Sequence, residues 1–173
     1  MKTERPRPDE YDKAFERYVS LVPETDVLVA LERQPADLAA LLAAVPPERE
    51  TFRYAPGKWT IRGVVGHVLD AERVFGYRAL CVARGEKASL PAFEEDDYAA
   101  RAKHDDRTIA SLLEEFSILR KSHVLMLRHI DDEASTRFGS ANALPITPRA
   151  LAYILVGHPR HHMAVLREKY GVR

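Results

Sequence analysis

Three of the seven histidines in this 173-residue chain lie within five positions of one another: His158, His161 and His162. They occur in the stretch YILVGHPRHHMAVLREKY, which also contains Pro159. Neutral imidazole is a preferred ligand of divalent cations such as Zn²⁺, and residues four apart lie on one face of a helix. His158 and His162 have this spacing, which is typical of one edge of a metal site.

A helical projection of this stretch places His158 and His162 at the centre of an apolar stripe and His161 at its edge. The apolar residues of the stripe are Leu151, Ile154, Leu155, Val165 and Leu166. Two buried imidazoles cost free energy unless they have polar partners, and a cation bound to both would supply one. A histidine pair is nevertheless a weak motif, so for this stretch alone hydrogen-bonded core histidines remain the preferred interpretation.

A second stretch, KWTIRGVVGHVLDAERVFGYRAL, changes this balance because it adds His67 on a different helix. His67 lies on the flank of the inward stripe that contains Val64, Val68, Ala71 and Phe75. Facing helices of a bundle commonly supply the ligands of a site in the core. Three protein ligands with an open position are the arrangement of a catalytic metal site. With His67 included, the metal site becomes the favoured interpretation, although no general base is evident and the catalytic residues stay unknown.

Two arginines, Arg78 and Arg120, also project toward the interior of their predicted helices. Inward arginines need carboxylate partners or a bound anion. The preferred interpretation is a structural pair with Glu72 or Asp70, and the alternative is that these arginines bind substrate. His161 is a further candidate for contact with substrate. His123 is interpreted as a hydrogen-bonded core residue, and His104 and His129 as surface residues.

Proline and glycine residues divide the chain into helical segments, and no stretch alternates apolar and polar residues long enough to predict a strand. The predicted helices are a short one over Asp9–Leu21 and four long ones over Asp26–Val45, Thr60–Arg84, Arg107–Ile130 and Pro148–Tyr170. Residues 86–106 are predicted to form an irregular crossover between the second and third long helices, and residues 139–148 a loop. The expected fold is therefore an all-α four-helix bundle with a long crossover and a short N-terminal helix.

The composition is that of an ordinary globular protein, with 46% hydrophobic and 30% charged residues. The length suits one domain over residues 1–173, in which residues 1–8 are expected to be a flexible tail. Lys+Arg and Asp+Glu both number 26, and this balance argues against binding to nucleic acid. No apolar run is long enough for a membrane span, no signal peptide is evident, and the one cysteine, Cys81, fits a reducing compartment. We expect a cytoplasmic protein.

The motifs at residues 58–80, 90–99 (LPAFEEDDYA) and 150–170 resemble those of the DinB/YfiT superfamily, and the match extends from about Tyr11 to Tyr170. The resemblance implies a four-helix bundle, often a homodimer, with a divalent metal such as Zn²⁺ or Ni²⁺ on three histidines. By motif position these ligands are His67, His158 and His162. The resemblance also implies an enzyme that acts on a small-molecule substrate, either a hydrolase or a transferase of low-molecular-weight thiols.

Pro159 is the one departure from the family pattern, because it directly follows the first histidine of the pair. Proline removes a helical hydrogen bond to the carbonyl of Leu155 and restricts the residue before it. This could re-aim His158 toward the metal, or it could make His161 a ligand in place of a neighbour; the family pattern favours His162. A second hypothesis is a non-catalytic bundle in which the metal is structural and serves dimerisation or damage-response binding.

Overall fold

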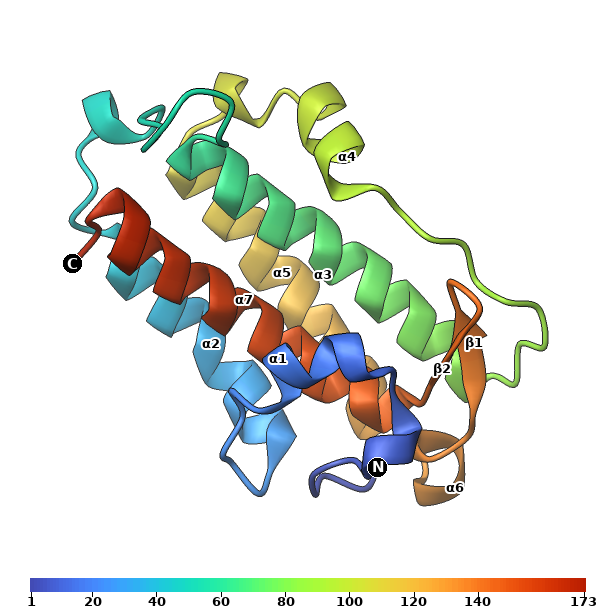
Figure 1. Cartoon of the computed structure of the whole chain (residues 1–173). Helices are drawn as coiled ribbons and strands as arrows, with labels where there is room; N and C mark the ends of the chain where they lie inside the picture. Colours follow the sequence, from blue (N-terminus) through green and yellow to red (C-terminus); the bar gives the residue numbers. More distant parts are fainter.

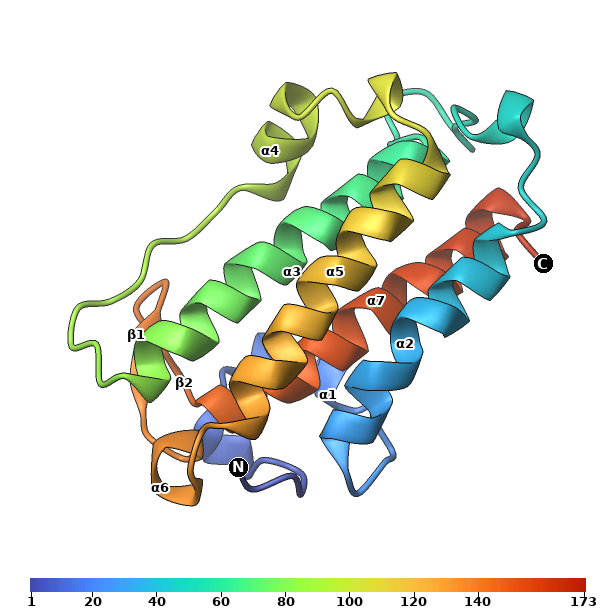
Figure 2. The same cartoon turned by 180° about the vertical axis from the view of Figure 1, so that it is seen from behind.

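The computed structural model describes all residues from 1 to 173, and four long helices form its body (Figures 1 and 2). These are α2 (Val27–Leu42), α3 (Ile61–Ala83), α5 (Ile109–Arg128) and α7 (Pro148–Tyr170). Both α2 and α3 pack against α5 and α7, so α2 and α3 occupy opposite corners of the bundle. The prediction of a predominantly helical four-helix bundle is confirmed.

The helices α3 and α5 run in the same direction, so the segment that joins them returns along the length of the bundle (Figure 1). This segment was expected to be irregular, but it contains α4 (Glu95–Arg101) and a 3₁₀ turn at His104–Asp106. The first turn of α4 carries Glu95, Asp96 and Asp97. Acidic side chains stabilise the positive end of a helix dipole, which explains why the acidic patch is helical.

Three long helices begin after a threonine whose hydroxyl accepts a hydrogen bond from a backbone N–H three residues later. The residues are Thr60, Thr108 and Thr147, and the O···N distances are 2.7, 3.2 and 3.1 Å. Such caps satisfy N–H groups that have no partner within the helix. α7 starts with Pro148 in its first turn and ends before Gly171, whose φ of 67° terminates the helix.

A two-stranded antiparallel hairpin precedes α7, and the prediction of a loop without strands at residues 139–148 was wrong here. Its strands are β1 (Gly139–Ala141) and β2 (Leu144–Ile146). Asn142 and Ala143 form the turn with φ values of 54° and 59°, as a two-residue hairpin turn of type I′ requires. Strands of three residues are too short for alternation of polar and apolar residues to reveal them.

The N-terminal helix predicted over Asp9–Leu21 is also wrong for most of its length. Only α1 (Glu16–Val19) is α-helical, and it follows a 3₁₀ turn at Lys13–Phe15. Tyr11 is extended and forms an antiparallel β-bridge with Ile146 at the end of β2. A short isolated helix is marginal in water, so tertiary contacts decide the local structure. Here they favour a bridge, a turn and one helical turn that packs on α7.

The apolar core consists of two clusters, one toward each end of the bundle. On each long helix, a buried polar residue lies at or close to the point in the sequence where the residues of one cluster are followed by those of the other. These residues are Gln34 on α2, Glu72 on α3, Arg120 on α5 and His158 on α7. The bundle therefore contains a polar layer at mid-length, and the candidate site belongs to it.

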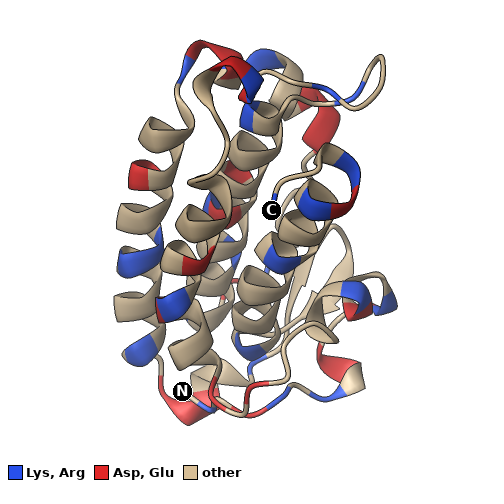
Figure 3. Ribbon diagram, turned by 90° about the vertical axis from the view of Figure 1, so that its left-hand side faces the viewer, with Lys and Arg blue, Asp and Glu red and all other residues tan.

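None of the helices is both long and apolar enough to span a membrane. Acidic and basic residues both occur on the face of the molecule in Figure 3, in keeping with a formal net charge of zero. The expectation that the chain does not bind nucleic acid was drawn from this balance and stays a prediction.

Candidate metal centre and pocket

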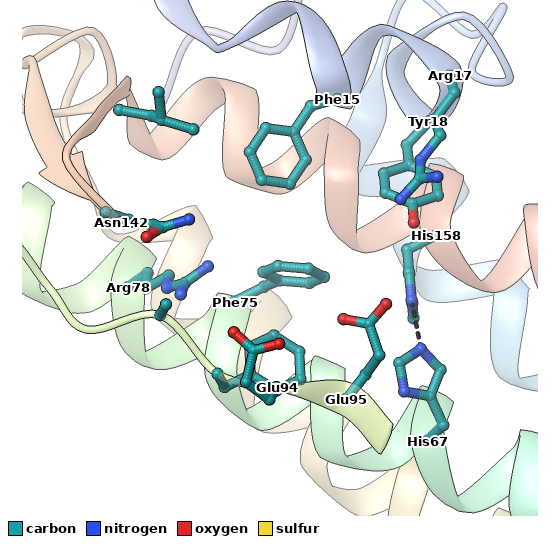
Figure 4. Close-up of a pocket in the computed structure, with 14 residues that line it drawn as sticks. Phe15, Arg17, Tyr18, His67, Phe75, Arg78, Glu94, Glu95, Asn142 and His158 are labelled. Atoms are coloured by element: carbon teal, nitrogen blue, oxygen red, sulfur yellow. Dashed lines mark hydrogen bonds between the residues drawn. The ribbon is translucent and has the colours of Figure 1, made fainter. Parts of the chain in front are cut away.

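The ring nitrogens of His67, His158 and His162 converge between α3 and α7. The Nε2 atom of His158 lies 3.0 Å from Nε2 of His67 and 3.1 Å from Nε2 of His162. One ligand atom from each of the three residues lies within 4.8 Å of the other two. α3 and α7 are packed neighbours, so His67 on one helix reaches the i, i+4 pair on the other. Figure 4 shows His67 and His158 facing each other.

Burial makes all three imidazoles poor bases. It lowers the pKa of His67 to about 4 and that of His162 to about 2. The pKa of His158 is also well below its usual value, first because of burial and then because of repulsion from His162 and His67. The three rings are therefore neutral at pH 7, which is the protonation state that binds a metal ion.

The three nitrogens fit a cation better than they fit one another. Two neutral imidazoles form a hydrogen bond only when one nitrogen carries the proton and the other offers a lone pair. Nε2 of His158 lies next to two other ring nitrogens. It can either donate its one proton or accept at its one lone pair, so it can form a hydrogen bond with only one of them. Tetrahedral zinc with Zn–N distances of 2.0–2.1 Å separates its nitrogen ligands by about 3.3 Å. The observed 3.0 and 3.1 Å are close to this value, so the donor set suits a divalent cation.

Aromatic rings hold two of these imidazoles in place. Trp59 packs against His67 with ring centroids 4.7 Å apart. Tyr18 and Phe75 contact His158 edge-on, with centroid distances of 5.2 and 5.6 Å. Rings that are packed on several sides have few rotamers available, so the site is organised before any ligand arrives.

Pro159 does not interrupt α7, which remains helical from Pro148 to Tyr170. The carbonyl of Leu155, which loses its helical donor to Pro159, accepts a hydrogen bond of 2.8 Å from Nη2 of Arg120. The next carbonyl, that of Val156, accepts one of 2.7 Å from the side chain of Gln34. Side chains from α5 and α2 thus satisfy the backbone beside the proline, and His158 keeps a helical position.

Arg120 belongs to this buried network and not to the pocket that the histidines line. Its Nε and Nη2 donate to the two carboxylate oxygens of Glu72 at 2.8 and 2.7 Å, and Nη1 donates to Gln34 at 2.7 Å. His123 contacts the same carboxylate at 2.8 Å. Burial alone would raise the pKa of Glu72, but Arg120 and His123 hold it below its usual value. The preferred interpretation of Arg120, a structural pair with Glu72, describes these contacts.

A cavity of about 260 Å³ adjoins the histidines. His67 and His158 line one end of it, and Arg78 and Asn142 lie toward the other end, with Phe15 and Phe75 between (Figure 4). The remaining polar lining residues are Arg17, Tyr18, Glu94 and Glu95. The cavity therefore offers an apolar middle and polar groups at both ends, which is typical of small-molecule sites.

His161 and His104 lie outside the converging set. His161 is half-buried, with its ring centroid 5.1 Å from that of His162, and burial lowers its pKa. His104 was expected on the surface, but it is buried and its Nε2 lies 2.9 Å from a carboxylate oxygen of Asp70. Gly66 makes this possible, because a Cβ atom there would come within 2.1 Å of the His104 ring.

Glu95 and Tyr18 line the pocket but were not predicted as site residues. In Figure 4 the Glu95 carboxylate and the Tyr18 hydroxyl are both directed toward His158. Burial is the main cause that raises the pKa of Tyr18, so its hydroxyl is protonated at neutral pH. The sequence contained one signal, the acidic patch EEDD, but nothing in it showed which bundle residues that patch covers.

Comparison with known proteins assigns the chain to a family. The model of the DinB superfamily matches residues 30–166. A protein of Geobacillus thermodenitrificans (strain NG80-2) named "Putative metal-dependent hydrolase" is 25% identical over 154 residues, which span 83% of this chain and 84% of that protein.

Among solved structures, YfiT from Bacillus subtilis, described as "a probable metal-dependent hydrolase with an unusual four-helix bundle topology", matches with a TM-score of 0.76. The match has 20% identity and covers 97% of this chain and 94% of that one, which shows a shared fold. The family model covers most of the chain and includes all three histidines. As its motifs predicted, the chain belongs to the DinB superfamily.

Proposed function

We propose that this protein is a metal-dependent enzyme that holds one divalent cation on His67, His158 and His162. The observation that carries the proposal is the convergence of three neutral, largely buried ring nitrogens at one end of a cavity. A structural site is normally closed by four protein ligands, whereas three ligands beside a pocket leave room for a substrate. The name of the curated relative supports the same chemistry.

A bound divalent cation lowers the pKa of a water molecule or thiol at its free position, which supplies a nucleophile near neutral pH. The chain's own residues would handle the proton and the substrate. Glu95, directed toward His158, accepts the proton of the nucleophile (Figure 4). The protonated hydroxyl of Tyr18 donates a hydrogen bond to the substrate oxygen on which negative charge develops.

We propose hydrolysis of a small molecule as the reaction, in line with the name of the curated relative. A low-molecular-weight thiol as cosubstrate, the choice between zinc and nickel, and a homodimer stay predictions. Esters and amides, and thiols together with electrophiles, should be screened with the metal-loaded protein and with Glu95→Gln. Hydrolysis predicts turnover of an ester or amide without added thiol and at least a hundredfold loss in Glu95→Gln, since general bases contribute about 10²–10⁴.

Metal content of protein purified without added metal tests the site itself. We expect about one ion per chain in the natural protein and loss of that ion in His67→Ala and His158→Ala. His161→Ala is the matched control, because His161 neighbours the site without belonging to the converging set. Retention of the ion in His67→Ala and His158→Ala would contradict the proposal. Loss of the ion only in His161→Ala would show that His161 is a ligand and that the proposed ligand set is wrong.

Removal of the metal with a chelator separates a catalytic ion from a structural one. We expect the chelated protein to remain folded and to lose activity, because two apolar clusters and the Glu72–Arg120 network support the bundle without it. Collapse of the fold on chelation would favour the second hypothesis, a structural metal in a non-catalytic bundle. Circular dichroism and activity measured on the same samples decide between them.

A further inference from the structure

Arg78 differs from the other buried arginines of the chain because it has no carboxylate partner. Three arginines are buried, Arg78, Arg120 and Arg149. Arg120 forms an ion pair with Glu72, and Arg149 forms one with Glu10. The sequence suggested that Arg78 pairs with Glu72 or Asp70, and neither pair exists: Arg120 occupies both oxygens of Glu72, and Asp70 contacts His104. Arg78 therefore forms no ion pair within the protein, although Glu94 and Glu95 line the same cavity.

The surroundings of Arg78 are mostly apolar. It is 5% exposed, and its guanidinium lies 5.9 Å from the ring centroid of Phe75 and 5.8 Å from that of Phe93. Its one side-chain hydrogen bond runs from Nη2 to the carbonyl of Pro91, at 2.7 Å, and its Nε is buried without a partner. Burial lowers the pKa of Arg78. A buried, unpaired guanidinium is costly, and an anion would remove most of this cost.

Arg78 shares its cavity with the candidate metal ligands. Arg78 and His67 are eleven residues apart on α3, which places them on one face with a separation of about 16 Å along the helix. Helical side chains lean toward the N-terminus, so the guanidinium is closer to the histidines than its Cα is. The side chain of Asn142, from the hairpin turn, lies beside it (Figure 4).

We propose that Arg78 and the side-chain amide of Asn142 bind the carboxylate of an elongated organic acid, whose reacting group lies at the three histidines. This inference rests on the proposed function and names the substrate class of the same site. The apolar middle of the substrate packs on Phe15 and Phe75. A singly charged carboxylate suits the site better than a phosphate, because Arg78 is the one arginine at this end of a cavity that Glu94 and Glu95 also line, while Arg17 lies at the histidine end (Figure 4). The expected span from carboxylate to reacting group is on the order of 10 Å.

Calorimetric titration with matched probes tests this inference. The probes are straight-chain ω-mercaptocarboxylates of increasing length, each paired with the ω-mercaptoalcohol of the same length. Each probe is titrated into metal-free and metal-loaded protein. In both forms we expect an optimal length at which the carboxylate binds about tenfold more tightly than the alcohol, the effect of one charge-assisted hydrogen-bond pair. Metal loading should tighten both probes through the thiol.

Variants assign the preference to Arg78. Arg78→Met should abolish the preference for carboxylate, and Arg78→Lys should retain part of it because the charge remains. Arg84→Met, at the exposed end of the same helix, should behave like the natural protein. Urea midpoints confirm that each variant is folded.

The two proposals fail in different ways. Equal binding of carboxylate and alcohol at every length, or a preference that survives in Arg78→Met, overturns the assignment of Arg78. A carboxylate preference without any gain from metal loading overturns the metal-dependent function and leaves the assignment of Arg78 standing.

Discussion

The guanidinium of Arg120 donates a hydrogen bond to the carbonyl oxygen of Leu155, the backbone group that Pro159 deprives of its helical donor. This contact crosses from α5 to α7 and lies three residues before His158. The same guanidinium is held by both oxygens of Glu72 on α3. Because it also donates to Gln34 on α2, all four long helices meet at this arginine, and it fixes the backbone that carries two of the three converging histidines.

Replacement of Arg120 by methionine should destabilise the protein by about 3–5 kcal/mol, because it leaves the buried Glu72 charge without compensation. Urea denaturation measures this loss. Arg128→Met is the matched control, since Arg128 pairs with Glu32 on the surface with both side chains more than 40% exposed. The control should cost less than about 1 kcal/mol. Similar losses of stability in the two variants would show that the buried network contributes no more than an exposed ion pair.

Pro159→Ala should reduce the dependence of the fold on Arg120. Alanine restores an N–H that can donate to the carbonyl of Leu155, so that carbonyl no longer relies on the arginine alone. In a double-mutant cycle, we expect Arg120→Lys to cost about 1 kcal/mol less in the Pro159→Ala background than in the natural one. Additive effects of the two substitutions would mean that the contact between Arg120 and Leu155 contributes little.

Metal-free protein should lose stability as the pH falls below about 6.5. Burial lowers the pKa of His67 to about 4 from a usual value near 6.5, so between these values the unfolded chain binds a proton that the folded chain does not. Stability is therefore unaffected above the unfolded pKa and declines below it, on the order of 2 kcal/mol for this histidine by pH 5.

Urea denaturation at pH 7 and pH 5 measures this loss. His67→Leu should show a smaller difference between the two pH values than the natural protein. His129→Gln, at an exposed position, should leave the difference unchanged. An unaltered pH dependence in His67→Leu would contradict the assignment of this stability loss to His67.

Gly157→Ala should be strongly destabilising. A Cβ atom at position 157 would lie 2.0 Å from the backbone carbonyl oxygen of Tyr18, so α1 would have to move away from α7. We expect a loss of at least 1–3 kcal/mol, typical of overpacking. Gly63→Ala is the control, because its Cβ would meet only side-chain atoms at 3.1 Å or more and alanine favours the helix. Thermal denaturation of both variants shows whether backbone contact makes the difference.

The parts of the fold that sequence could predict are those set by local periodicity and capping. The long helices have apolar stripes, and Thr60 and Pro148 mark two of their starts. The same periodicity placed His158 and His162 on one inward face. It could not show which helix packs against that face, so the pairing with His67 depended on the family resemblance and on bundle geometry.

The parts that could not be predicted depend on contacts between distant segments. Tyr11 is extended because Ile146 lies beside it, and no local signal in residues 9–21 indicates this bridge. His104 is buried because Gly66, on a different helix, leaves space for its ring. The unpaired state of Arg78 is similar, because the two carboxylates suggested as its partners contact Arg120 and His104 instead. To predict such contacts, one must know which side chains are already paired with another residue.

The β-bridges at the hairpin have a consequence for folding kinetics. Residues near Tyr11 and Leu90 both bridge the hairpin, and the backbone N–H of Asn142 donates to the carbonyl of Leu90. Contacts of such high contact order form slowly because long loops must close first. His67 and His158 are themselves 91 residues apart in the sequence, so both ends of the cavity should be completed late, after the individual helices have formed.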